Sequence, residues 1–494
     1  MSNLSFRSVD LVPQSAVNAT GGQWGLARTD AGRRLVVSLP PESPVLAEVE
    51  GERQQLAASV LIVGPLSPRN AAAMRRHLPW LSPVLIGRRT SAGLGDRLGL
   101  ATPGHVRAIR QAAPAIAPVF AQQSIREMAR THRTPEDVID AATWGAFEAG
   151  WRDGFGSDAD HLKAPDEIDR CLAAGFTQFT FDPGAFVNAD DAAGDGERVR
   201  RALDALPWDG LEDSPGGLLA RYEGRRFDAD GLEIVFDGET AARAAVKYGG
   251  AVAHVAALYR HLRESAGERP FEIEVSVDET ETPTTHAEHL LIATELQRLG
   301  VAWIGLAPRF VGRFEKGVDY IGDVGEFDRD VAGHAAIARA NGGYKLSLHS
   351  GSDKFSIYPA IARHTRGLVH LKTAGTSYLE ALRVVAATDP AFFASIYSFS
   401  RARYDSDRAS YHVSARLDHA AEDAGTMDRP ADLLDQFDAR EILHVTFGSV
   451  LTAVDDEGRP KFADRIKELL ERFPGKYAEA LERHFVRHLA PFKA

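Results

Sequence analysis

The sequence predicts an α/β protein built as a (β/α)8 barrel of the TIM type. Three observations predict it: eight short β-rich runs, amphipathic helices between them, and a chain of 494 residues that is 44% hydrophobic. Strands that alternate with helices are typical of a parallel sheet, and eight such units can close into a barrel. A doubly wound sheet is the alternative, because a strand count alone does not establish closure.

The strands are predicted from runs of apolar and β-branched residues at 83–87, 115–121, 155–163, 176–182, 271–278, 301–307, 344–349 and 367–372. Helices are predicted between them from amphipathic spacing at 135–150, 165–175, 286–300, 327–343 and 377–388. Several of these helices open with Pro or Asp and close on Gly, which are ordinary start and stop signals.

The rest of the chain is divided around this barrel, which is placed at residues 81–389. Residues 1–80 are predicted to form an N-terminal α/β appendage. The long gap after the fourth strand, about 183–240, is interpreted as an inserted cap with one further strand, "LEIVF". Residues 390–494 are predicted to be mainly helical, with one β-like run, "ILHVTF" (442–447).

Composition limits the partners and the compartment. The net charge of -12 disfavours nucleic acid and anionic lipid as partners. The single Cys171 excludes an intramolecular disulfide framework, and no segment approaches the uninterrupted apolar length of a membrane span. We therefore expect a cytoplasmic protein that acts on a small molecule, and we leave a homo-oligomer open.

Strand register predicts which side chains face the barrel lumen. Side chains alternate between the two faces of a strand, so the apolar residues of each run mark the face toward the helices. The polar face then holds Glu272, Glu274, Ser276, Asp278, Lys345, Ser347, His349, His370, Lys372, Gln178, Thr180, Asp182, His161 and Lys163. Most titratable groups lie near the carboxyl ends of their strands, where catalysis occurs in this fold.

This concentration of ionisable groups favours a metal site. Burying so many of them without a partner would be strongly destabilising, and imidazoles with a carboxylate suit zinc and related first-row metals. The predicted ligands are His161, His349, His370 and Glu274, and the predicted ion is Zn, Mn or Ni. One polar residue at a strand end is more often a helix cap, so the convergence carries the argument.

Two loops have their own interpretation. "GLGDRLG" (93–99) has G-x-G-x-x-x-G spacing and no acidic residue in the expected context, so no nicotinamide cofactor (NAD) is expected. Its alternative role is a loop that turns Asp96 and Arg97 toward the barrel mouth. In "HSGSDKFS" (349–356), Ser350, Ser352 and Lys354 could hold a carboxylate or phosphate at a helix start, or simply cap that helix.

Five segments carry a resemblance to a known family: 276–289, 306–323, 344–359, 367–386 and 407–415. They include "SVDETETPTTHAEH", "YKLSLHSGSDKFSIYP" and "GLVHLKTAGTSYLEALRVVA", and together they resemble the tagaturonate epimerase family. The resemblance implies interconversion of D-tagaturonate and D-fructuronate. It also implies activity on free tagatose and fructose among relatives, with dependence on a divalent metal.

The chemistry of that reaction constrains the site. The inverted carbon is β to the ketone, so the carbonyl does not acidify its C–H bond and simple enolisation cannot invert it. Retro-aldol cleavage, followed by re-addition to the other face of the aldehyde, can invert this carbon. It requires a Lewis acid at the ketone oxygen, a base at the β-hydroxyl and cations for the substrate carboxylate.

Register then assigns the remaining roles. Asp182 and Asp278 are the predicted acid and base, and Glu279 replaces Asp278 if a bulge shifts the strand end. Lys163 is a further candidate for catalysis and substrate charge. The other candidates for binding substrate are Asp96, Arg97, Gln178, Arg309, Ser350, Ser352, Lys354 and Lys372.

Rival functions remain open at this point. Lys163, Lys345 or Lys372 could form a Schiff base with the ketone and run the same cleavage without metal, as in an aldolase. Transient oxidation by a bound nicotinamide would also invert the carbon. A noncatalytic sugar-acid sensor is the alternative outside enzymes, although binding alone needs no general base.

Overall fold

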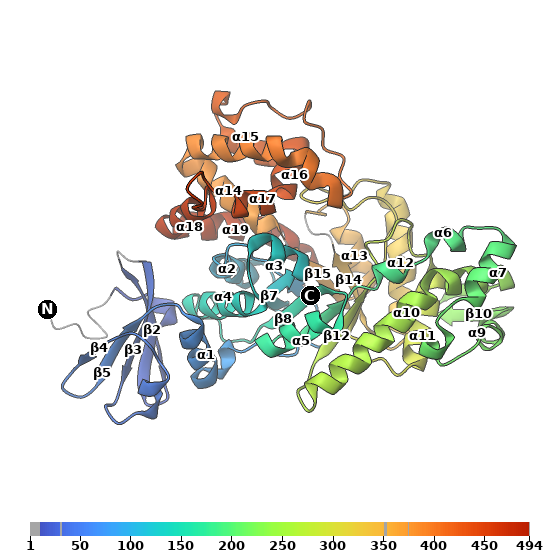
Figure 1. The fold of residues 1–494 in the computed structure, drawn as a ribbon, viewed down its shortest axis with the longest axis horizontal. Coiled ribbons are helices and arrows are strands. Elements are labelled where there is room, and N and C mark those ends of the chain that lie inside the picture. The colour runs from blue at the N-terminus through green and yellow to red at the C-terminus, as the bar shows by residue number, and fades with distance from the viewer. Residues whose placement is uncertain (1–9, 30–31, 350–352, 374, 494) are drawn as a thin grey trace.

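The protein folds around a closed barrel of eight parallel strands, as predicted (Figure 1). The computed structural model describes residues 10–29, 32–349, 353–373 and 375–493. The strands follow one another around the barrel as β6 (Ser91–Gly93), β7 (Ala117–Ser124), β8 (Gly156–Leu162), β9 (Gln178–Phe181), β12 (Glu272–Ser276), β13 (Gly305–Ala307), β14 (Lys345–His349) and β15 (Val369–Lys372). Pairing of β15 with β6 closes the ring.

Helices cover the outside of this ring. They are α2 (Thr102–Ala112), α3 (Ile125–Thr131), α4 (Pro135–Glu148), α5 (Pro165–Ala174), α10 (Gly238–Ala266), α11 (His286–Arg298), α12 (Val324–Ala340), α13 (Tyr358–Thr365) and α14 (Thr376–Thr388). Outward residues of the strands, such as Ile273, Val275, Leu346 and Leu371, are buried in the main hydrophobic core. The alternation that predicted these strands therefore also sets which face turns inward.

The prediction of a strand at 83–87 is wrong, because the first barrel strand is β6. The amides of Ile86 and Gly87 donate to the Glu272 carboxylate at 3.0 and 2.6 Å. Val84 and Leu85 are each 39% exposed. Since Glu272 begins β12, this apolar run crosses the amino-terminal end of the barrel. Strand β6 itself, Ser-Ala-Gly, has no apolar alternation that would reveal it.

The N-terminal region is a five-stranded antiparallel sheet of order β1-β2-β3-β5-β4, beside the barrel in Figure 1. Its elements are β1 (Val17–Ala19), β2 (Gly22–Thr29), β3 (Gly32–Leu39), β4 (Glu52–Gln55), β5 (Val60–Gly64) and α1 (Pro68–His77). We propose a domain boundary near residue 80 on this basis, and another near residue 389.

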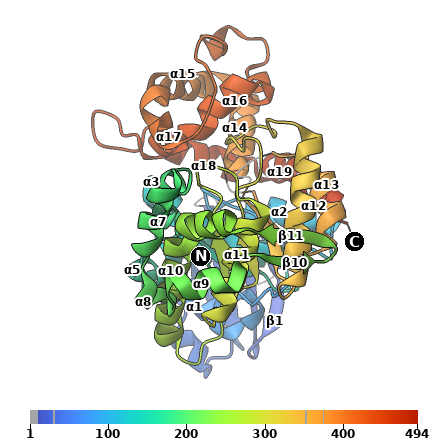
Figure 2. The ribbon, with the colours of Figure 1, turned by 90° about the vertical axis from the view of Figure 1, so that its right-hand side faces the viewer.

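The segment between β9 and β12 forms α6 (Ala189–Ala192), α7 (Gly196–Asp204), α8 (Trp208–Leu211), α9 (Pro215–Tyr222) and the hairpin β10 (Arg225–Ala229) with β11 (Leu232–Phe236). The predicted strand "LEIVF" is β11. This insert has its own small core, in which Tyr222 and Phe236 pack with Leu291 of α11 and Ile337 of α12. It lies against the side of the barrel (Figure 2).

The C-terminal region is helical: α15 (Pro390–Asp407), α16 (Phe437–Val445), α17 (Phe447–Thr452), α18 (Ala463–Arg472) and α19 (Pro474–Leu489). The prediction of a β-like run at 442–447 is wrong. Ala439, Ile442 and Leu443 are all fully buried, which is helical spacing of apolar residues. Among the helices of the described residues, none is long and apolar enough to cross a membrane.

Candidate active site

The largest cavity near the predicted site opens at the carboxyl ends of β12, β13 and β14 and has a volume of about 470 Å³. Its lining includes the acids Asp278, Glu279 and Glu281 and the bases Arg126, Arg309, Arg313 and Lys316, together with His349 and His412. Among the described residues, the insert lines none of it. The cavity lies where catalytic sites occur in this fold, and both charge signs line it.

His349, the last residue of β14, is held between two carboxylates. Its Nε2 lies 2.5 Å from Glu274 Oε1, and its Nδ1 lies 3.3 Å from Asp278 Oδ1. Burial opposes the charged form and Lys372 repels it, but the two carboxylates outweigh them and raise the pKa of His349 to about 9. This place in the barrel therefore favours positive charge.

Strand β8 reaches the site through a bulge that the sequence analysis missed. Its pairing with β9 shifts between Ala159 and Leu162, and His161 has a positive φ of 55°. Asp160 therefore faces the lumen by normal alternation, while the bulge turns the adjacent His161 in as well. His161 Nδ1 lies 3.1 Å from Asp182 Oδ2, and its Nε2 lies 3.8 Å from Asp160 Oδ1.

Lys372 lies near these histidines among three buried carboxylates. Its Nζ is 2.7 Å from Asp160 Oδ1, 2.9 Å from Asp158 Oδ2 and 2.9 Å from Glu274 Oε1. Burial opposes its charge, but these neighbours raise its pKa well above the ordinary value. The lysine therefore stays charged and neutralises part of the acidic floor of the site.

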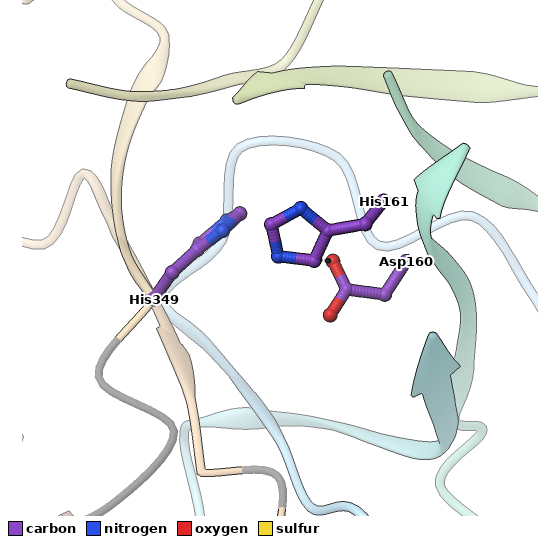
Figure 3. A group of neighbouring side chains, drawn as sticks. All are labelled: Asp160, His161 and His349. Atoms are coloured by element: carbon purple, nitrogen blue, oxygen red, sulfur yellow. Dashed lines mark ion pairs between the residues drawn. The ribbon is translucent and has the colours of Figure 1, made fainter. Parts of the chain in front are cut away.

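Asp160, His161 and His349 form a group that could hold a metal ion, because one ligand atom from each lies within 4.8 Å of the others. Figure 3 shows the two imidazoles turned toward each other, with Asp160 beside His161. A second group, His161 with Asp182 and Glu279, shares one histidine with the first. Two imidazoles and a carboxylate suit zinc and other first-row divalent metals. The residues present therefore fit such an ion.

His370 and Gln178 lie deeper in the barrel than this group. His370 Nδ1 lies 2.8 Å from Ser91 Oγ, and burial lowers the pKa of His370 to about 3. It belongs to none of the three-residue ligand groups of the described chain. Gln178 begins β9, opposite Glu272 at the start of β12. The structure thus brings His161 and His349 together, places Glu274 against His349, and leaves His370 outside the ligand group.

Asp96 and Arg97 are occupied within their own surroundings. The Asp96 carboxylate accepts hydrogen bonds from the amides of Leu98, Gly99 and Ala101. The Arg97 guanidinium pairs with Glu127 at 2.6 Å and lies over the Phe447 ring. These contacts organise the loop after β6, and neither residue lines the large cavity.

Lys354 is also occupied, and Arg309 is better placed for substrate. Lys354 Nζ donates to the carbonyl oxygens of Glu315 and Val318 at 2.9 and 2.5 Å. Arg309 lines the cavity, where it donates to backbone carbonyls. Lys163 pairs with Asp182 at 3.2 Å and is 55% exposed. The predicted Ser350 and Ser352 lie outside the described residues.

Four functional candidates are absent from the sequence analysis. Strict alternation that turns His161 and Lys163 inward turns Asp158 and Asp160 outward, although the three-residue step between the apolar Ala159 and Leu162 signals the bulge that brings them into the lumen. Arg126 and Lys316 line the cavity from loops and a helix, where strand alternation gives no information.

The barrel and the histidine-carboxylate group at its carboxyl end define the class of protein: a (β/α)8 barrel enzyme with an ionisable centre beside a charged cavity. Comparison with known proteins specifies it further. The family model described as tagaturonate epimerase matches residues 18–492. The chain belongs to the tagaturonate epimerase family and is an epimerase, as the sequence resemblance implied.

Individual relatives agree with this assignment. A tagaturonate/fructuronate epimerase of Thermotoga maritima is 42% identical over 421 residues, which cover 85% of this chain and 84% of the relative. Crystal structures of a fructuronate-tagaturonate epimerase from Cohnella laeviribosi are 36% identical. The glycerol complex has a TM-score of 0.92 and covers 98% of this chain and 97% of that one. The native form has a TM-score of 0.91, with 98% and 96% covered.

Proposed function

We propose that the protein interconverts D-tagaturonate and D-fructuronate by metal-assisted retro-aldol cleavage and re-addition. The observation that carries the proposal is the group of Asp160, His161 and His349 beside a cavity lined by both carboxylates and cations. The membership of the chain in the tagaturonate epimerase family supports tagaturonate and fructuronate as the two substrates. The free ketohexoses tagatose and fructose are proposed as weaker substrates of the same site.

The metal ion belongs, in this proposal, to Asp160, His161 and His349. When bound there, a zinc, manganese or nickel ion supplies a Lewis acid for the ketone oxygen. Asp182 positions His161 by contacting Nδ1 of that imidazole, and Asp278 positions His349 by contacting Nδ1 of that imidazole. Carboxylates in this arrangement fix the orientation of an imidazole ring that would hold a metal ion. We therefore assign Asp182 and Asp278 as positioning residues.

Glu279 is the proposed base. It lines the cavity and its Oε1 is held by Arg126 Nη2 at 2.8 Å. Burial opposes its charge, but His161 and Lys316 outweigh burial and lower its pKa, so the carboxylate is ionised and accepts a proton. It takes the proton of the C4 hydroxyl as the C3–C4 bond breaks and its electron pair passes to the ketone as an enediolate. The aldehyde turns, the bond re-forms on its other face, and Glu279 returns the proton.

Arg309 and Lys316 are proposed to hold the substrate carboxylate. Both line the cavity, and Arg309 is held by the carbonyl oxygens of Thr280, Phe310 and Gly312, which leave its charge for a ligand. A uronate carries a carboxylate where the free ketose carries a hydroxyl. These cations therefore favour the uronate over the free ketose.

A Schiff-base aldolase is the second candidate, and the environment of the lysines disfavours it. A nucleophilic lysine must be neutral, whereas three carboxylates keep Lys372 charged. Burial lowers the pKa of Lys345 to about 8, but its Nζ donates to Ser91 deep in the barrel. Borohydride trapping of a covalent adduct would support the aldolase instead.

The mechanism is tested by analysing the product formed in D2O. It is also tested by supplying the two three-carbon fragments that retro-aldol cleavage of the substrate would release. Retro-aldol chemistry keeps the C4–H bond, so the epimer formed in D2O carries no deuterium at C4. The same enzyme should join dihydroxyacetone to the three-carbon aldehyde acid and yield both hexuronates. Deuterium at C4, or no joining of the halves, would contradict the retro-aldol route.

A further inference from the structure

A second cluster of histidines and a carboxylate lies outside the proposed active site. His484 and His488 are one helical turn apart on α19, and Asp353 follows the end of β14. Their relative exposures are 6%, 0% and 8%, so all three residues are buried. None of them lines the active-site cavity. The chemistry of this cluster is therefore separate from that of His161 and His349.

Three atoms of this cluster converge on one point. His484 Nε2 and His488 Nε2 each lie 3.1 Å from Asp353 Oδ1, and the two nitrogens are 3.0 Å apart. Ligand atoms around a tetrahedral zinc ion are about 3.3 Å from one another, given metal–ligand distances of about 2.0–2.1 Å. The triangle formed by the three atoms therefore has nearly the size of one face of a zinc coordination sphere.

The remaining polar atom of each side chain has an outer partner. Arg440 Nη2 donates to Asp353 Oδ2 at 2.8 Å. The Tyr358 hydroxyl lies 2.7 Å from His488 Nδ1, and Glu380 Oε1 lies 3.6 Å from His484 Nδ1. Metal-binding histidines and carboxylates are characteristically oriented by such outer contacts. Here the contacts turn both Nε2 atoms and Oδ1 toward the shared centre.

Hydrogen bonds alone satisfy this centre poorly. If both Nε2 atoms carry a proton, two N–H groups meet at 3.0 Å. If only one does, the other nitrogen turns its lone pair toward a carboxylate oxygen at 3.1 Å. A cation would use the lone pairs of all three atoms at once.

We propose that Asp353, His484 and His488 form a second binding site, for a zinc-type divalent metal ion. Two imidazoles and one carboxylate are a known zinc ligand set, and the fourth position is left to water. The site joins helix α19 to the segment that follows His349, the last residue of β14. Its role is therefore to fasten the C-terminal helix beside the active-site strand.

The test counts zinc in the full-length protein. Chelator-treated wild type, H484Q/H488Q and H161Q/H349Q are each equilibrated with Zn²⁺, freed of excess ion and analysed by mass spectrometry of the metal. H484Q/H488Q is expected to hold one zinc ion fewer per chain than wild type. H261Q/H364Q is the matched control, because both of its histidines pair with an aspartate near the surface. It should hold as much zinc as wild type.

H161Q/H349Q separates the two sites. It should keep the zinc ion of the second site, so Zn²⁺ should still raise its Tm. The part of the Tm increase that zinc at the second site causes in wild type should be absent from H484Q/H488Q. Equal zinc content in wild type and H484Q/H488Q would overturn the proposal. If H484Q/H488Q fails to fold, anomalous diffraction at the zinc edge from wild-type crystals decides. A peak between Asp353, His484 and His488 supports the site, and no peak overturns it.

Discussion

The rings of His161 and His349 meet edge to face with their centroids 5.2 Å apart, although the two residues are far apart in the sequence. A bulge at the end of β8 supplies one ring and the end of β14 supplies the other. Asp182 contacts His161, Asp278 contacts His349, and Lys372 pairs with Asp160 beside them. The relationship therefore depends on barrel closure, and it creates the proposed metal centre.

Replacing Glu279 should separate catalysis from metal binding. E279Q is expected to lower kcat by about 10²- to 10⁴-fold, the usual contribution of a general base. D278N should instead weaken metal affinity by about 10- to 100-fold, because Asp278 positions His349. Turnover of fructuronate and zinc titration of both variants check this. E281Q, which alters another carboxylate of the cavity wall, is the control. Equal loss of zinc affinity in E279Q and D278N would contradict the division of roles.

Lys316 should govern the choice between uronate and ketose. K316M removes a cation proposed to bind the substrate carboxylate, so KM for fructuronate should rise by about 10- to 100-fold. KM for fructose, which has no carboxylate, should change little. Initial rates with both substrates measure the ratio. A parallel rise for the two substrates would show that Lys316 does not read the carboxylate.

Lys372 should matter strongly for stability. K372M leaves Asp158, Asp160 and Glu274 together without their buried cation, which should lower the free energy of unfolding by about 3–5 kcal/mol. K163M, at the mostly exposed Lys163, should cost less than about 1 kcal/mol. Urea denaturation of both variants and wild type measures these changes in the free energy of unfolding. Adding D158N to K372M should recover part of the loss, and no recovery would argue against charge crowding as its cause.

Glu441 should make stability depend on pH. Burial and the neighbouring Glu315 raise the pKa of Glu441 to about 8, above the ordinary value of 4.5. The folded state therefore keeps a proton that the unfolded state has lost, and its stability falls as the pH rises from about 5 to 8. E441Q should flatten this fall, while the exposed E468Q should leave it unchanged. Urea denaturation at several pH values measures it, and an unaltered slope in E441Q would refute the assignment.

Sequence alternation predicted the barrel because most of its strands bury apolar residues against the helices. Ile273 with Val275, and Leu346 with Leu348, mark the outer face and thereby place Glu274 and His349 inside. Alternation fails where that contrast is missing. Strand β6 consists of Ser91, Ala92 and Gly93, so the pattern favours a strand in the more apolar run at 83–87 instead.

The site was less predictable than the fold, because local geometry decides it. The bulge after Ala159 turns two adjacent residues, Asp160 and His161, toward the same centre, which strict alternation forbids. Position along a strand matters as well. His370 faces the lumen as predicted but lies beside Ser91, away from the carboxyl-end cluster. Cations such as Lys316 come from loops, whose direction no periodicity predicts.

The central claim is that Asp160, His161 and His349 support metal-dependent epimerisation of a hexuronate. NMR of wild-type protein with fructuronate, in Zn²⁺ and again in chelator, tests it most directly when H349Q is run beside it. The account predicts tagaturonate from wild type with Zn²⁺ and none in chelator or from H349Q. Tagaturonate at the same rate in chelator, or from H349Q, would contradict the claim, as would no tagaturonate under any of these conditions.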